Sequence, residues 1–215
     1  MIKGVIFDLD GVIVESEDAH IEAEKQTFQK HNVLVSAEEL HRYTGTTAKE
    51  MFTQLIAKYK LNTAFEEINS QKEKILFRLL KQDAEPTKGV LRFMQELKQR
   101  GIRLAVGSSS PKRIADYILK KLDIVNLLDC IVTAEDVEHS KPSPETFLKA
   151  AIQLGLSPSQ CLVIEDARLG VEAAKSAGMK CIGYRNPHSG NQDLSKADII
   201  TADFSKLNID KIITL

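Results

Sequence analysis

Short apolar runs and amphipathic stretches alternate along most of the chain. Between two of these runs, Val90, Phe93, Met94 and Leu97 fall on one side of a predicted helix that Gly101 ends. Strands that alternate with helices are typical of a mostly parallel sheet, so the pattern predicts an α/β fold. The six apolar runs are residues 4–7, 102–106, 130–132, 161–164, 180–183 and 198–200.

Residues 15–83 break this alternation, because they contain helical stripes but no convincing strand run. One stripe consists of Met51, Leu55, Ile56 and Tyr59. We therefore expect an all-α domain at 15–83, inserted into a core domain made of 1–14 and 84–215. The last stripe is interpreted as core packing, and its residues are Phe65, Ile68, Ile75, Leu76 and Leu79.

Two serine-proline pairs mark expected helix starts. Ser110-Pro111 and Ser143-Pro144 each suggest an N-cap serine followed by a proline at the first helical position.

Composition and charge exclude several partners. The 215 residues are 43% hydrophobic, which is enough to bury a core. The formal net charge is −1 and the Lys and Arg residues are scattered, so we expect no nucleic-acid partner. No apolar stretch approaches the ~20 residues that cross a bilayer, so we expect no membrane partner either.

The cysteines indicate a reducing compartment. Cys130, Cys161 and Cys181 are odd in number, far apart and flanked by apolar residues, which favours buried thiols over disulfides or zinc ligands. The chain also runs from Met1 into the first apolar run without a leader pattern. We therefore expect a cytoplasmic protein, and we expect it to be a monomer.

Two acids follow the first apolar run, in the segment Asp8-Leu9-Asp10-Gly11-Val12. Residues two apart in an extended segment share a face, so Asp8 and Asp10 can point at one bound group, while Gly11 allows a sharp turn. The carboxyl ends of parallel strands are where open α/β sheets bind ligands. One carboxylate can attack while the other carries protons. For so short a pattern, a plain turn is the alternative interpretation.

Two further loops follow predicted strands and belong to the same sheet edge. Ser108, Ser109 and Ser110 offer hydroxyl and backbone N–H groups ahead of a helix, which suits phosphate oxygens, although a polar loop with a helix cap is the alternative. Pro142 restricts the residue before it and helps to aim Lys141, although most lysines are solvated surface residues.

A fourth predicted strand ends in two adjacent acids, Glu165 and Asp166. Acids that follow a buried strand need a positive partner, and a divalent cation is the natural one. The alternative is a simple helix cap, because a helix is expected at 167–177.

Taken together and in this order, the four segments resemble the motifs of the haloacid dehalogenase superfamily of phosphate-handling enzymes. Residues 8–12 match the first motif, Ser108 ends the second, Lys141 is the centre of the third, and residues 165–166 are the fourth. The resemblance spans nearly the whole chain and implies a Rossmann-like parallel-sheet core. The helical insertion is similar to the cap domain of the β-phosphoglucomutase-like subgroup.

The resemblance also implies roles at the matching positions. Asp8 would be the nucleophile that forms an aspartyl-phosphate, and Asp10 would be the general acid and then the general base. Ser108, the backbone of Ser109, and Lys141 would bind the oxygens of the transferred phosphoryl group.

A magnesium ion is implied at the same edge of the sheet. Asp8, Asp166 and the backbone carbonyl of Asp10 would hold Mg²⁺, with Glu165 assisting directly or through water.

The predicted cap carries fewer clues. His20 lies where β-phosphoglucomutases have a cap histidine, and a partly buried polar residue is the alternative interpretation. Mutases of the subgroup also have an arginine just after a glycine-centred turn, but residues 45–49 place Ala48 there. Lys49 is one residue further, about 100° around a helix. A charge run of Lys72, Lys74 and Arg78 is interpreted as a solvated face.

These departures favour a phosphatase over a mutase. A mutase has to hold two phosphates in turn and keep water from its aspartyl-phosphate. Ser110-Pro111 also resembles the form seen in several phosphatases. We expect a magnesium-dependent phosphatase that acts on a small phosphate ester, a sugar phosphate foremost. The alternatives are a β-phosphoglucomutase and a non-catalytic binding protein on the same scaffold.

Overall fold

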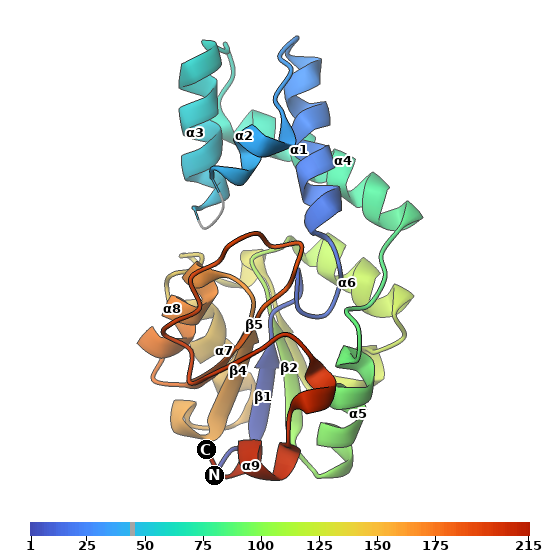
Figure 1. The fold of residues 1–215 in the computed structure, drawn as a ribbon, viewed down its shortest axis with the longest axis vertical. Helices are drawn as coiled ribbons and strands as arrows, with labels where there is room; N and C mark the ends of the chain where they lie inside the picture. The colour runs from blue at the N-terminus through green and yellow to red at the C-terminus, as the bar shows by residue number, and fades with distance from the viewer. Residues whose placement is uncertain (44–45) are drawn as a thin grey trace. The chain divides into compact units, whose positions relative to one another are not determined.

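The computed structural model describes residues 1–43 and 46–215, which divide into two compact units (Figure 1). One unit consists of Met1–Glu15 with Glu85–Leu215, and the other is Ser16–Ala84. The expected division into domains at 1–14 with 84–215 and at 15–83 stays a prediction, because compactness alone does not show that a unit folds by itself.

Within the described residues, the first unit is built on one sheet of six parallel strands. The order across the sheet is β3-β2-β1-β4-β5-β6, and the predicted α/β fold is confirmed. Each strand begins and ends within one residue of its predicted bounds. The strands are β1 (Gly4–Phe7), β2 (Arg103–Gly107), β3 (Cys130–Val132), β4 (Cys161–Glu165), β5 (Lys180–Tyr184) and β6 (Ile199–Thr201).

Helices lie on both faces of this sheet (Figure 1). They are α5 (Val90–Gln99), α6 (Lys112–Lys121), α7 (Glu145–Leu154), α8 (Arg168–Ser176) and α9 (Ile209–Ile213), with short 3₁₀ turns η1 (Val125–Leu127), η2 (Ala134–Asp136), η3 (Pro158–Gln160) and η4 (Phe204–Lys206). None of the helices in the described part of the chain is long and apolar enough to span a bilayer.

Successive side chains of β1 point to opposite faces, as the pleat of a strand requires. Ile6 belongs to the apolar cluster that contains Phe147 of α7 and Val171 of α8. Phe7 contacts Phe93 of α5, with ring centroids 6.4 Å apart. Because both faces are covered, every residue of β1 is buried, which explains its continuous apolar sequence.

The position of β1 determines where the loops meet. β1 pairs with β2 on one side and with β4 on the other. The chain therefore changes direction across the sheet at β1, and such a switch point leaves a crevice at the carboxyl ends of the strands. The loops after β1, β2 and β4 all open there.

The helices after the two serine-proline pairs begin one residue later than predicted. α6 starts at Lys112 and α7 at Glu145, so Pro111 and Pro144 are the N-cap residues. Pro111 has an extended backbone with ψ of 143° and lies outside the helix. Ser110 therefore precedes the cap position, and its hydroxyl is available for another partner.

The second unit is helical in its described residues, 16–43 and 46–84. Met51, Leu55 and Ile68 belong to its apolar core together with Phe28, and Phe65 packs against it. Ile75 and Leu76 are buried as well. The interpretation of the last stripe as core packing is confirmed for these residues, whereas Leu79 is only half-buried. The helices are α1 (Glu17–Lys30), α2 (Ala37–His41), α3 (Ala48–Tyr59) and α4 (Phe65–Gln82).

The cysteines are free thiols inside the first unit. Cys161 and Cys181 are buried and Cys130 is half-buried. Burial raises the pKa of Cys130 and of Cys161 to about 11, so their reactive thiolate forms are scarce.

The burial of Ile6 leads to a prediction about stability. We expect Ile6→Ala to lower the free energy of unfolding by about 2–5 kcal/mol, because it removes buried methyl groups from the centre of the sheet. The matched control is Ile152→Ala on α7, since Ile152 is 76% exposed. The control should change stability by less than about 0.5 kcal/mol. Urea unfolding measures both, and equal effects would contradict the prediction.

Candidate active site

The candidate site is built around the ammonium group of Lys141. Its Nζ donates to Oδ1 of Asp8 and to Oε1 of Glu165, the latter at 2.7 Å. The side chains of Lys141, Asp8 and Glu165 are only 8%, 10% and 2% exposed. The ring of Phe147 lies 4.7 Å from Nζ, within the range of a cation–π contact. Lys141 is therefore not a solvated surface lysine.

This cluster shifts the protonation equilibria of its members. Burial raises the pKa of Asp8 to about 8; Lys141 opposes that rise, while Glu165 and Asp10 add to it. Burial by itself would lower the pKa of Lys141, but Asp8 and Glu165 hold it above its ordinary value. Lys141 thus stays charged, and additional positive charge beside Asp8 would favour the ionised carboxylate.

Asp10 is held by a serine that the sequence interpretation assigned to a helix start. Oγ of Ser110 donates to Oδ2 of Asp10 at 2.5 Å. The backbone N–H of Ser110 in turn donates to Oγ of Ser108 at 2.9 Å. Ser108 and Ser110 are buried, whereas Ser109 between them is exposed. The serine-rich segment was visible in the sequence, but which serine contacts Asp10 depends on the folded loop.

Glu165 ends β4 and lies against the start of α8. Its Oε2 accepts from the backbone N–H of Ala167 at 2.8 Å. A Cβ atom at Gly170 would lie 1.7 Å from Oε1 of Glu165, so only a residue without a side chain fits there. The carboxylate is thereby fixed between Lys141 and the backbone of α8.

Asp166 does not cap the helix that follows it. The N-cap residue of α8 is Ala167, and no side chain caps this helix. Oδ2 of Asp166 instead accepts from the hydroxyl of Ser189. This carboxylate also packs against the first motif, because a Cβ atom at Gly11 would lie 2.1 Å from Oδ2 of Asp166. The helix-cap interpretation is therefore wrong for Asp166.

Two buried residues of the loop after β5 also reach this region, and the sequence analysis missed both. Nδ2 of Asn186 donates to the backbone carbonyl of Gly11 at 2.8 Å and to Oε2 of Glu15 at 3.0 Å. Ser189 contacts Asp166. Their position after a predicted strand was the available indication. Asn and Ser are common in any loop, so the residue types alone do not single them out.

The candidate residues His20 and Lys49 lie in the second unit. Nδ1 of His20 on α1 is 2.8 Å from Nζ of Lys72 on α4. Lys72 is 7% exposed, so the interpretation of the charge run as a solvated face is wrong for this residue. Lys49 is exposed near the start of α3. Gly45 corresponds in sequence to the centre of the glycine turn of the mutases, and it is outside the described residues.

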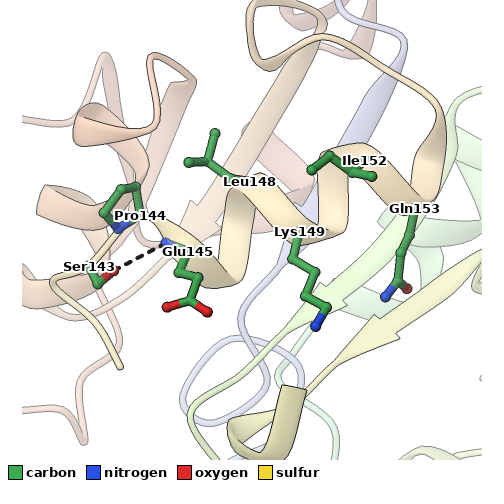
Figure 2. Close-up of a pocket in the computed structure, with 7 residues that line it drawn as sticks. All are labelled: Ser143, Pro144, Glu145, Leu148, Lys149, Ile152 and Gln153. Atoms are coloured by element: carbon green, nitrogen blue, oxygen red, sulfur yellow. Dashed lines mark hydrogen bonds between the residues drawn. The ribbon is translucent and has the colours of Figure 1, made fainter. Parts of the chain in front are cut away.

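Neither a preformed metal cage nor the hollow in Figure 2 defines the site. In residues 1–43 and 46–215, no three His, Cys, Asp or Glu side chains form a group that could hold a metal ion. A shallow hollow of about 540 Å³ lies along α7, and the candidate site residues are not among those that line it. Its lining is Ser143, Pro144, Glu145, Leu148, Lys149, Ile152 and Gln153.

Known proteins resemble this chain over nearly its full length. Residues 5–184 match the family model for haloacid dehalogenase-like hydrolases. Validoxylamine A 7'-phosphate phosphatase from Streptomyces hygroscopicus subsp. limoneus is 32% identical over 207 residues, which is 96% of each chain. β-Phosphoglucomutase from Bacillus subtilis (strain 168) is 31% identical over 220 residues, which cover 97% of this chain and 93% of that protein.

A solved structure agrees with these relatives. The crystal structure of a CbbY mutant from Rhodobacter sphaeroides, in complex with xylulose-(1,5)bisphosphate, has a TM-score of 0.86 at 25% identity and covers 97% of each chain. The region matched by the family model contains all four motifs found in the sequence. The chain therefore belongs to the haloacid dehalogenase-like hydrolases, in the subfamily of β-phosphoglucomutase and CbbY that carries a helical cap.

Proposed function

We propose that the protein is a magnesium-dependent phosphatase that hydrolyses a small phosphate ester through an aspartyl-phosphate intermediate. A sugar phosphate is the favoured substrate. The observation that carries the proposal is the buried ion pair between Asp8 and Lys141. Asp10 follows Asp8 by two residues, just beyond the end of β1. A buried carboxylate beside a fixed ammonium suits attack on a phosphoryl group whose oxygens need positive partners.

In the first step, a carboxylate oxygen of Asp8 attacks phosphorus. The bond between phosphorus and the alcohol oxygen breaks, and the phosphoryl group becomes bonded to Asp8. Asp10 gives its proton to the departing oxygen. The hydrogen bond from Ser110 holds the carboxyl group of Asp10 in place for this transfer.

In the second step, water attacks the phosphorus atom of the aspartyl-phosphate. Asp10, now ionised, takes the proton from that water, and inorganic phosphate leaves the carboxylate of Asp8. Asp10 thus ends the cycle protonated, as it began. Lys141, the hydroxyl of Ser108 and the backbone N–H of Ser109 bind the phosphoryl oxygens in both steps.

Magnesium fits the acidic residues of the site. Asp8 and Glu165 contact the buried ammonium group of Lys141, and Asp166 packs against Gly11. Their carboxylates are the hard oxygen donors that Mg²⁺ prefers. Mg²⁺ keeps several waters and needs only one or two carboxylates, so it does not require a closed protein cage. Asp8, Asp166 and the carbonyl of Asp10 would hold it, with Glu165 assisting. Bound there, it would offset the repulsion between Asp8 and the phosphate.

β-Phosphoglucomutase is the second candidate function. The 31% identity to that enzyme from Bacillus subtilis nearly equals the 32% identity to the phosphatase from Streptomyces, so overall similarity does not choose between them. Ala48 favours the phosphatase, because it is exposed at the start of α3 where the mutases carry an arginine. Without that cation, a second phosphate is held less strongly.

A panel of phosphate esters tests the proposed function directly. We expect β-glucose 1-phosphate or another ester in the panel to release inorganic phosphate with Mg²⁺ and a trace of glucose 1,6-bisphosphate, and EDTA to stop the release. Phosphorus NMR follows all species at once. Conversion to glucose 6-phosphate without phosphate release would establish the mutase. If no ester in the panel were turned over, the non-catalytic binding protein would be favoured instead.

The nucleophile is tested by Asp8→Asn. We expect kcat to fall by at least about 10³-fold, because the amide cannot form the aspartyl-phosphate. The control is Asp210→Asn, since the side chain of Asp210 is 79% exposed and forms a surface ion pair with Arg100. Turnover of the best ester measures both variants, and a fully active Asp8→Asn would disprove the mechanism.

The close contact between Gly11 and Asp166 is tested by two glycine variants. Gly11 and Gly178 have similar positive φ values of +76° and +72°, but a Cβ atom at Gly178 would meet nothing within 4 Å. Gly11→Ala and Gly178→Ala should each cost about 1–2 kcal/mol of stability from backbone strain. Only Gly11→Ala should also lower kcat/KM, because it displaces Asp166. Urea unfolding and ester turnover separate these effects, and equal activities would exclude a role for the contact.

A further inference from the structure

The loop between β5 and β6 contacts two of the motifs. It contributes Asn186 and Ser189, which are 2% and 6% exposed, whereas Arg185 before them is exposed. Buried polar side chains need partners, since burial without a hydrogen bond is costly. Each forms a hydrogen bond to a motif residue outside the loop, Asn186 to Gly11 and Ser189 to Asp166.

Asn186 anchors the beginning of this loop. Its Nδ2 donates to the carbonyl of Gly11 and to the carboxylate of Glu15, and its Oδ1 accepts from the backbone N–H of His188 at 2.8 Å. Both ends of the amide are therefore bonded, which defines its orientation. The anchor fixes the loop against the turn that follows Asp10.

Ser189 then lies over the carboxylate of Asp166. Its hydroxyl donates to Oδ2, the same oxygen that packs against Gly11. A hydroxyl is a neutral donor, so it orients the carboxylate without cancelling the negative charge that attracts a cation. A lysine or an arginine at this position would hold Asp166 as well, but it would neutralise it.

We propose that Ser189 is a positioning residue that aligns Asp166 for the divalent cation, and that Asn186 holds the loop from which it acts. The proposal rests on the proposed function, because it assumes that Asp166 is a ligand of that ion. Hydrogen bonds to a ligating carboxylate restrict its rotation, and their loss lowers metal affinity about 10–100-fold. The loop after β5 is thereby a further part of the site, beyond the four motifs.

Binding of Mn²⁺ to the whole protein, without substrate, tests the proposal. Mn²⁺ accepts the same hard oxygen ligands as Mg²⁺, and the EPR signal of the free ion reports its concentration. We expect Ser189→Ala to weaken Mn²⁺ binding about 10–100-fold. Ser189→Thr keeps the hydroxyl and should restore affinity to within about threefold, which a purely structural role would not predict.

Ser195→Ala is the matched control, because Ser195 lies in the same loop but is exposed. It should bind Mn²⁺ like the natural chain, and thermal unfolding should show that all variants are folded. Equal Mn²⁺ affinity of Ser189→Ala and the natural chain would overturn the positioning role while leaving the phosphatase proposal intact. If the natural chain bound no Mn²⁺, the magnesium-dependent mechanism would fail together with this proposal.

Discussion

The buried ammonium group of Lys141 connects the carboxyl ends of two strands of the sheet. Lys141, from the segment after β3, donates to Asp8 beyond β1 and to Glu165 at the end of β4. Removing one member of such a buried cluster typically costs about 3–5 kcal/mol, because it leaves a charge without its partner. Buried ion clusters of this kind often contribute no more stability than apolar residues of the same volume would. Lys141 keeps the two carboxyl groups close together, and a cation bound beside them would favour the ionised form of Asp8.

The sheet makes this cluster possible. In a parallel sheet all carboxyl ends lie at one edge, and the order β3-β2-β1-β4-β5-β6 places the first motif between the second and the fourth. Close backbone approach completes the arrangement. Gly11 and Gly170 leave room for the carboxylates of Asp166 and Glu165, where any side chain would displace them. The positions of these carboxylates thus depend on the two glycines.

The second unit has its own apolar core and a buried polar group of its own. His20 and Lys72 are in contact. Burial raises the pKa of the nearby Glu24 carboxyl above its ordinary value, although the charges of Lys72 and His20 oppose that rise. Relatives whose names state different activities, a phosphatase and a mutase, resemble this chain at almost equal sequence identity.

The sequence by itself determined the six strands, the helical insertion and the family, because short-range patterns of apolar residues and residue order encode them. It also indicated Asp8, Asp10, Lys141 and the acids after β4 as site candidates, since acids and lysines at strand ends are conspicuous. Tertiary structure decided the rest. Ser110 contacts Asp10 across 100 positions of sequence and Asn186 contacts Gly11 across 175, and no local pattern specifies such pairs. Whether Lys72 is solvated or buried was likewise decided by the packing of α4, because burial belongs to the folded chain and not to the residue type.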